Sequence, residues 1–127
     1  MPKEIVYTDH APKPFAGYSQ AVKCNGFVYV SGTGPMDPRT GEVVGRTIQE
    51  QTRQCLKNVQ AILEAAGSSL DRAVSATVIM ADGKKDFAGM NEEWGKWFTA
   101  NPPARQGAVL PVRPKGMRLS IAVIAEG

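Results

Sequence analysis

The chain has 127 residues, of which 43% are hydrophobic and 21% charged, proportions that fit a single soluble domain over residues 1–127. No apolar run reaches the ~20 residues that a membrane-spanning helix needs. The first residues lack the apolar core of a secretory signal, so we expect a cytoplasmic protein with no membrane partner. The formal net charge is only +3 and the basic residues are scattered, which argues against nucleic acid as the partner.

The first part of the chain has the pattern of short strands joined by tight turns. Residues 4–8, 19–23 and 27–31 form three predicted strands. Asn25-Gly26 stands between the second and third, and this pair is typical of a hairpin turn. The segment 37–41 (Asp-Pro-Arg-Thr-Gly) predicts another tight turn, because proline and glycine occupy positions that such turns favour.

Residues 47–66 have the clearest helix pattern in the chain. Thr47 and Glu50 form a Thr-x-x-Glu capping box, and Gly67 is placed to end the helix in a left-handed conformation. Apolar residues recur at three- and four-residue steps, namely Ile48, Cys55, Leu56, Val59, Ile62, Leu63 and Ala66. We therefore expect this helix to bury one apolar stripe, including the Cys55 thiol.

The second half predicts three strands and another helix. Residues 73–80 are rich in β-branched side chains, and residues 108–112 and 117–125 are the two later strand candidates. A helix is predicted over residues 87–100, and Pro102 cannot continue it. One face of that helix carries Phe87, Met90, Asn91, Trp94, Trp97 and Phe98. In the last strand, Met117, Leu119, Ile121 and Val123 alternate with Arg118, Ser120, Ala122 and Ile124.

The predicted element order is β-β-β-α-β-α-β-β, which indicates the α+β class. Two helices can cover only one face of a sheet of about six strands. The other face still carries isoleucine and valine, and therefore has to be buried by something else. This pattern indicates a domain that associates with copies of itself.

The segment 101–107 (Asn-Pro-Pro-Ala-Arg-Gln-Gly) is the main candidate for a binding site. Its two prolines set an extended backbone, and Arg105 follows at once. A guanidinium offers a planar fork of donors that matches a carboxylate or a phosphate. The Gly107 amide lies two residues on, with no side chain to shield it. From the residues alone, an anion site and a solvated arginine after a turn both remain open.

Other reactive residues are few. Cys24 and Cys55 lie far apart without metal-type spacing, which indicates reduced thiols. A Ser-His-Asp triad or a histidine-bound metal would have to use His10, the single histidine, and its place near the N-terminus argues against both. His10 is either a solvated loop residue or a substitute acid-base group.

Several motifs in register over residues 5–125 are similar to those of the RidA/YjgF family of reactive-intermediate deaminases. They are Gly17-Tyr18-Ser19-Gln20-Ala21, Tyr29-Val30-Ser31-Gly32, Asp37-Pro38-x-Thr-Gly41, Gln51-Thr52-Arg53-Gln54, Ala65-Ala66-Gly67, Asp86-Phe87-x-x-x-Asn91, Pro103-Ala104-Arg105 and Pro114-Lys115-Gly116. The resemblance implies a chorismate-mutase-like fold and a homotrimer, with three sheets forming an inner barrel inside the helices. It also implies ligand sites between subunits and no metal or organic cofactor.

The resemblance implies hydrolysis of 2-imino acids, or their enamine tautomers, to 2-keto acids and ammonia. Arg105 would hold the substrate carboxylate, and the Gly107 amide would lie close to the reacting end. Further substrate contacts are expected from Tyr18, Ser31, Thr33, Phe87, Asn91 and Trp94. The alternatives are a packed tyrosine at position 18, local hydrogen bonds at 31 and 33, and a core or interface tryptophan at 94. For Phe87 and Asn91 the alternative is helix capping or packing, and for Arg105 it is a salt bridge between subunits.

The chain departs from the family pattern on its last strand. The resemblance places Ala122 where active members carry a glutamate that orients or activates water, and Ser120 where a second acid is common. General acid-base help is typically worth 10²–10⁴-fold in rate, and alanine cannot provide it. We therefore keep two hypotheses: a deaminase with an altered substrate, and a non-catalytic trimer that binds small carboxylates. An endoribonuclease or translation inhibitor is less favoured, and Arg118 is either a second anion donor or a solvated edge residue.

Overall fold

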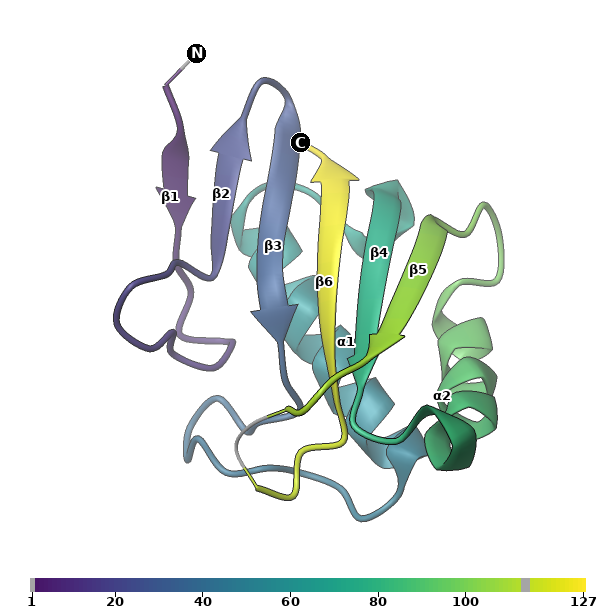
Figure 1. Cartoon of the computed structure of the whole chain (residues 1–127). Coiled ribbons are helices and arrows are strands. Elements are labelled where there is room, and N and C mark those ends of the chain that lie inside the picture. The colour runs from purple at the N-terminus through teal and green to yellow at the C-terminus, as the bar shows by residue number, and fades with distance from the viewer. Residues whose placement is uncertain (1, 113–114) are drawn as a thin grey trace.

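The six strands form one mixed sheet in the order β1-β2-β3-β6-β4-β5, and both helices lie on one face of it (Figure 1). The computed structural model describes residues 2–112 and 115–127. The strands are β1 (Glu4–Val6), β2 (Ala21–Cys24), β3 (Phe27–Thr33), β4 (Ala73–Met80), β5 (Ala104–Val109) and β6 (Leu119–Glu126). Only β4 and β5 pair in parallel; the other neighbours are antiparallel. The predicted α+β class, element order and six-stranded sheet are confirmed.

Two predicted turns are confirmed by their backbone geometry. Asn25 and Gly26 have φ values of 51° and 83°, the left-handed pair that a two-residue hairpin between β2 and β3 requires. In the turn at residues 37–41, the Gly41 N–H donates to the Asp37 carbonyl at 2.8 Å. The first turn lies before β3 and the second after it, so they lie toward opposite ends of that strand (Figure 1).

Helix α1 (Ile48–Ala65) has the predicted start and end. The Glu50 N–H donates to Thr47 Oγ1, and the Thr47 N–H donates to Glu50 Oε1, both at 3.1 Å. Gly67 follows the last turn with a φ of 83°. Two backbone N–H groups also hold the Glu50 carboxylate and lower its pKa below the ordinary value.

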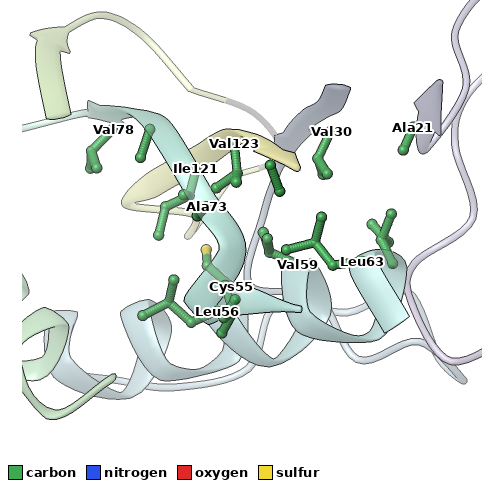
Figure 2. Close-up of a cluster of buried hydrophobic side chains, with 14 of the residues drawn as sticks. Ala21, Val30, Cys55, Leu56, Val59, Leu63, Ala73, Val78, Ile121 and Val123 are labelled. Carbon is green, nitrogen blue, oxygen red and sulfur yellow. The ribbon is translucent and has the colours of Figure 1, made fainter. Parts of the chain in front are cut away.

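The apolar stripe of α1 packs on the sheet and makes the centre of the core (Figure 2). Cys55, Leu56, Val59 and Leu63 of α1 are fully buried against this face. Burial raises the pKa of the Cys55 thiol well above its ordinary value, so this thiol has a packing role. From the sheet, the core takes alternate residues of its central strands, among them Val30, Ala76, Val78, Ile121 and Val123.

Helix α2 (Gly83–Trp97) is displaced toward the N-terminus relative to the predicted 87–100. It begins earlier because Asp82 caps it, its side chain accepting the Lys85 N–H at 3.1 Å. It ends earlier because Phe98 leaves the helical conformation and packs its ring on Trp94, with 4.6 Å between centroids.

The bounds of five of the six predicted strands need correction. β1 ends at Val6 and not at residue 8, β2 covers Ala21–Cys24 and not 19–23, and β3 extends to Thr33 and not only to residue 31. The strand predicted over residues 108–112 is β5, which begins at Ala104 because residues 104–109 pair with residues 75–80 of β4. Arg105 therefore lies within a strand and not ahead of it. The last strand starts at Leu119, two residues later than predicted, and its alternation is otherwise confirmed.

A buried carboxylate joins the two helices. Glu93 of α2, with a side chain only 3% exposed, accepts from Arg53 Nε of α1 at 3.2 Å and from Trp97 Nε1 at 3.0 Å. Lys96 Nζ lies 3.6 Å from the same carboxylate. Burial alone would raise the pKa of Glu93, but the hydrogen bonds from Arg53 and Trp97 and the two positive charges outweigh it and lower that pKa.

We expect Glu93→Gln to lower the free energy of unfolding by about 1–3 kcal/mol at pH 7. A broken buried ion pair costs about 3–5 kcal/mol, and the loss here is smaller because the Arg53 side chain is half exposed. A lowered folded-state pKa stabilises the fold above the ordinary value of 4.5, and that contribution disappears as the pH falls through the folded-state pKa. Denaturant titrations at pH 7 and pH 3 measure both effects.

The matched control is Glu92→Gln, because Glu92 is exposed on the same helix. This variant should change the free energy of unfolding by less than about 0.5 kcal/mol. Equal losses in the two variants would show that the Glu93 contacts add nothing specific.

Candidate functional site

Arg105 lies on edge strand β5, on the side of the sheet that the helices cover. It pairs in register with Ala76 of β4, a core residue, so the two side chains share a face. Its guanidinium carbon lies 5.0 Å from the Trp94 ring centroid and 5.8 Å from that of Phe87. Nη1 is 4.0 Å from the sulfur of Met90. One face of α2 therefore holds the arginine by cation–π contacts.

The fork of Arg105 remains available to an anion. Among residues 2–112 and 115–127, no carboxylate is paired with it, and its side chain is exposed. Phe87 and Trp94 therefore lie beside Arg105, with Trp94 itself buried in the core, and their expected contact with substrate stays a prediction. Asn91 is exposed on α2, one turn after Phe87.

Gly107 lies two residues after Arg105 on the same face of β5 and pairs with Val78. A Cβ at Gly107 would lie 3.1 Å from the Val78 carbonyl oxygen, closer than ordinary packing allows. Glycine therefore suits the close approach of β5 to β4, and it leaves the backbone beside Arg105 uncovered.

A second hollow lies on the other, uncovered face of the sheet. This open-face groove has a volume of about 540 Å³, and its lining includes Phe15, Tyr18, Ser31, Ile79, Met117 and Ser120. The Tyr18 ring is half exposed and makes an edge contact with Phe15, with 6.4 Å between centroids. Tyr18 therefore lines this groove, and its expected contact with substrate stays a prediction.

Ser31 and Thr33 use their hydroxyls inside the fold. Ser31 Oγ donates to the Ser19 carbonyl at 2.6 Å, and Thr33 Oγ1 donates to the Ser31 carbonyl at 2.7 Å. Ser31 lines the open-face groove, whereas Thr33 is buried beside it. Each hydroxyl can still accept a hydrogen bond, but its proton is already committed.

The two positions where an acid was expected lie on the open face. Ser120 pairs with Ile79, and Ala122 with Thr77, two residues further along β6. Ser120 lines the groove, directly above Gly32, where an added Cβ would meet Ser120 Oγ at 2.9 Å. Ala122 is not among the residues that line it.

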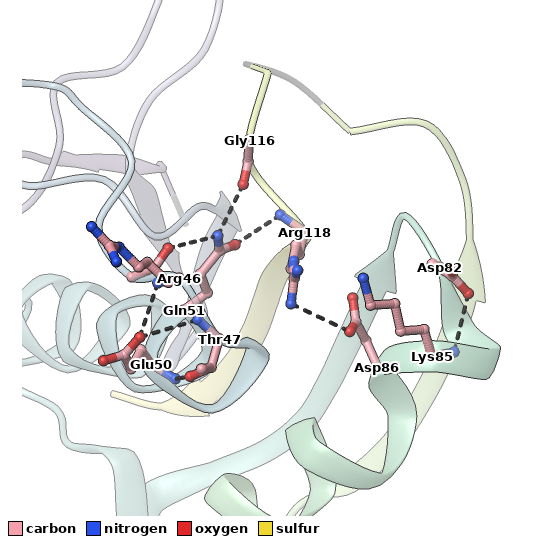
Figure 3. Close-up of polar contacts among 10 residues, drawn as sticks. Arg46, Thr47, Glu50, Gln51, Asp82, Lys85, Asp86, Gly116 and Arg118 are labelled. Carbon is pink, nitrogen blue, oxygen red and sulfur yellow. Dashed lines mark hydrogen bonds and ion pairs between the residues drawn. The ribbon is translucent and has the colours of Figure 1, made fainter.

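Arg118 is neither a free anion donor nor a solvated edge residue, the two roles expected from the sequence. Its side chain pairs with Asp86 of α2, with Nη1 3.7 Å from Oδ1, and the Asp86 side chain is buried (Figure 3). Its N–H donates to Gln51 Oε1 at 2.8 Å, while Gln51 Nε2 donates to the Gly116 carbonyl at 2.9 Å. These contacts fix residues 116–118 next to the groove. Pro114, which belongs to the motif before them, lies outside the described residues.

His10 lies apart from both regions. It lines another hollow, of about 570 Å³, with Asp9, Asp37 and Lys57 on its walls, and this hollow shares no residue with the open-face groove. The position of His10 does not support a role as a substitute acid-base group for that groove. In the described part of the chain, no group of three or more His, Cys, Asp or Glu residues could hold a metal, and no helix could cross a membrane.

Sequence reasoning missed three features of these regions. Phe15 and Met36 line the groove from irregular segments, where no periodicity marks a side chain as functional. The third is the buried Asp86. Its place one turn after the capping residue Asp82 is visible in the sequence, but its pairing with Arg118 is a tertiary contact that the sequence does not show.

The chain thus has two candidate half-sites on opposite faces of its sheet. The Arg105 half-site offers a cation, and the open-face groove has no charged side chain among its described lining residues.

Comparison with known proteins gives a consistent set of relatives. The family described as "Endoribonuclease L-PSP" matches residues 8–127. A RutC family protein of Pyrococcus horikoshii is 45% identical over 123 residues, covering 97% of each chain. The 2-iminobutanoate/2-iminopropanoate deaminase of Rattus norvegicus is 39% identical, covering 97% of this chain and 89% of its own. The structure of E. coli TdcF with bound serine, 35% identical, superposes with a TM-score of 0.90 over 98% of both chains.

Proposed function

Because the chain belongs to the RidA/YjgF family, as its match over residues 8–127 shows, we propose that it hydrolyses 2-imino acids to 2-keto acids and ammonia. The named deaminases among its relatives support this reaction class. The bound serine in TdcF, a small molecule with a carboxylate, supports the same class of ligand.

The observation that carries the proposal is the state of Arg105. This exposed guanidinium has no carboxylate partner among the described residues, and Phe87 and Trp94 hold it in place from one side. A planar fork fixed by packing suits the two oxygens of a carboxylate. The neighbouring amide of Gly107 would add a backbone donor close to the same anion.

The chemistry requires little from the protein. Water adds to the C=N carbon and one of its protons moves to the nitrogen, which gives a carbinolamine. The nitrogen then takes the hydroxyl proton as the C–N bond breaks, which releases ammonia and leaves the keto acid. Arg105 would cancel the carboxylate charge next to the reacting carbon and orient the substrate. Because a protonated imine carbon is already a good electrophile, positioning supplies much of the remaining help.

We further propose that the complete site forms between copies of the chain, in a homotrimer. Arg105 and the open-face groove lie on opposite faces of one sheet, so a small substrate cannot use both within one chain. The edge strand β5 and the open face also expose large apolar side chains, among them Tyr29, Val109 and Leu110. A cleft that brings Arg105 of one copy to the groove of another would complete the site.

Light scattering on the purified protein should therefore give about three times the chain mass of 13.6 kDa. A monomer at micromolar concentration would contradict the shared site.

A second candidate function rests on the missing acids. Neither Ser120 nor Ala122 can act as a base, and no carboxylate lines the described part of the groove. A trimer that binds small carboxylates without turnover would need only Arg105. A nuclease, the activity in the family description, is not favoured, because the net charge is only +3 and His10 lies away from both half-sites.

We expect Arg105→Ala to weaken binding of 2-oxobutanoate at least ten-fold, because hydrogen bonds to a charged group contribute about 1.5–3 kcal/mol. Calorimetric titration measures the affinity, and circular dichroism should show an unchanged fold because the side chain is exposed. The matched control is Arg39→Ala, whose side chain is 88% exposed on a turn. If both variants bind like the wild type, the carboxylate site lies elsewhere.

Ser120→Glu should raise the rate of keto-acid release from 2-iminobutanoate at least ten-fold, the lower range of general-base catalysis. The glutamate would enter the groove above Gly32, where the absent Cβ leaves room. Ala122→Glu should give a smaller gain, because position 122 does not line the groove.

A wild-type rate that already equals that of the named deaminases would show that backbone groups suffice to hold the water. A larger gain from Ala122→Glu would place the attacking water further along β6.

A further inference from the structure

We propose that the open-face groove binds the side chain of the imino acid and selects large apolar side chains, with Met36 and Met117 setting its size. This inference rests on the proposed deaminase function and narrows its substrate class. The protein should then prefer imines derived from leucine, methionine and phenylalanine over the imine derived from alanine.

The lining of the groove is apolar. Phe15, Ile79, Val112 and the two methionines supply most of its walls, and the polar side chains in it are hydroxyls. The Ser31 hydroxyl proton is already donated within the fold. A polar or charged substrate side chain would lose its water here without gaining a partner, whereas an apolar one is favoured by burial.

The size of the groove also exceeds what the smallest substrates need. Its volume of about 540 Å³ lies within the range of pockets that enclose whole small ligands. Two glycines keep it open: Gly32 lies under Ser120, and Gly34 lies under the methionines. A methyl side chain would leave most of this space unfilled.

The two thioethers form one part of the groove wall, over Gly34. A Cβ built on Gly34 would lie 2.8 Å from Met36 Sδ and 2.8 Å from Met117 Sδ, so both sulfurs rest on that backbone. Methionine is unbranched and adapts its shape to what it contacts, and its sulfur packs well on aromatic rings. This wall can therefore yield to a branched, thioether or aromatic side chain.

The backbone position of Met117 is fixed by contacts of the next residue, Arg118. Arg118 follows it and is held through Gln51 and Asp86, and the Ala81 N–H donates to the Arg118 carbonyl at 2.9 Å. The backbone of residues 117–118 is thus tied to α1, α2 and the end of β4, while the Met117 side chain remains the adjustable part.

The test compares imines generated in situ by an amino-acid oxidase from alanine, 2-aminobutyrate, leucine, methionine and phenylalanine, with keto-acid release as the readout. We expect kcat/KM to be at least ten-fold higher for the leucine-derived imine than for the alanine-derived one, since one methylene in an apolar pocket discriminates about 10–200-fold. Calorimetry with pyruvate and 4-methyl-2-oxopentanoate should give the same order of affinity without turnover.

Two variants locate the selectivity. Gly34→Ala pushes both sulfurs into the groove and should lower kcat/KM for the leucine-derived imine at least ten-fold, with the alanine-derived imine changed less than about three-fold. Met117→Ala widens the groove and should shift the preference toward the phenylalanine-derived imine. Met80→Leu, a core substitution under the helices, is the control and should leave the order unchanged.

If the wild type shows no preference for the leucine-derived imine over the alanine-derived one, or the opposite preference, in both rate and keto-acid affinity, this inference is wrong. The deaminase proposal would then still stand. If no imine of any size is turned over, the deaminase proposal fails. The keto-acid affinities then still decide whether the groove selects large apolar side chains.

Discussion

The pairing of β6 with both β3 and β4 is the constraint on which the rest of the structure depends. β6 joins the antiparallel unit β1–β3 to the parallel pair β4–β5, and without it there are two separate small sheets. Its alternation also divides the molecule: Leu119, Ile121, Val123 and Ala125 are buried under α1, and Ser120 and Ala122 face the uncovered side. One face of β6 therefore contributes to the core, and the other face contributes to the open-face groove.

This division explains why the functional groups lie apart in a single chain. Arg105 belongs to the covered side, where α2 supplies the rings that hold it, and the groove belongs to the uncovered side. Helix α2 touches both regions, because Asp86 holds Arg118 beside the groove and the next residue, Phe87, lies against Arg105. The Glu93 contacts that fix α2 on α1 thus also support the position of the candidate anion site.

Much of the fold could be predicted from local signals. The capping box at Thr47, the Asn25-Gly26 turn and the apolar period of α1 depend on neighbours in sequence, and each was recognisable. The sequence does not predict the true start of β5, because all six of its residues are exposed and no alternation marks the strand. Its pairing with β4 is a tertiary contact. Arg105 could be chosen for its chemistry, whereas the groove could not be predicted, because its walls come from separate segments that only the folded sheet brings together.

The central place of β6 has a consequence for how the protein is made. Synthesis proceeds from the N-terminus, and residues 119–126 are translated after every other strand and helix. Until they leave the ribosome, β3 and β4 each present an unpaired edge, and the apolar stripe of α1 lacks the strand that lies over its middle. Folding of this domain therefore completes only after translation of its last strand, and from the formation of β4 until then the growing chain carries unpaired strand edges that can pair with other chains.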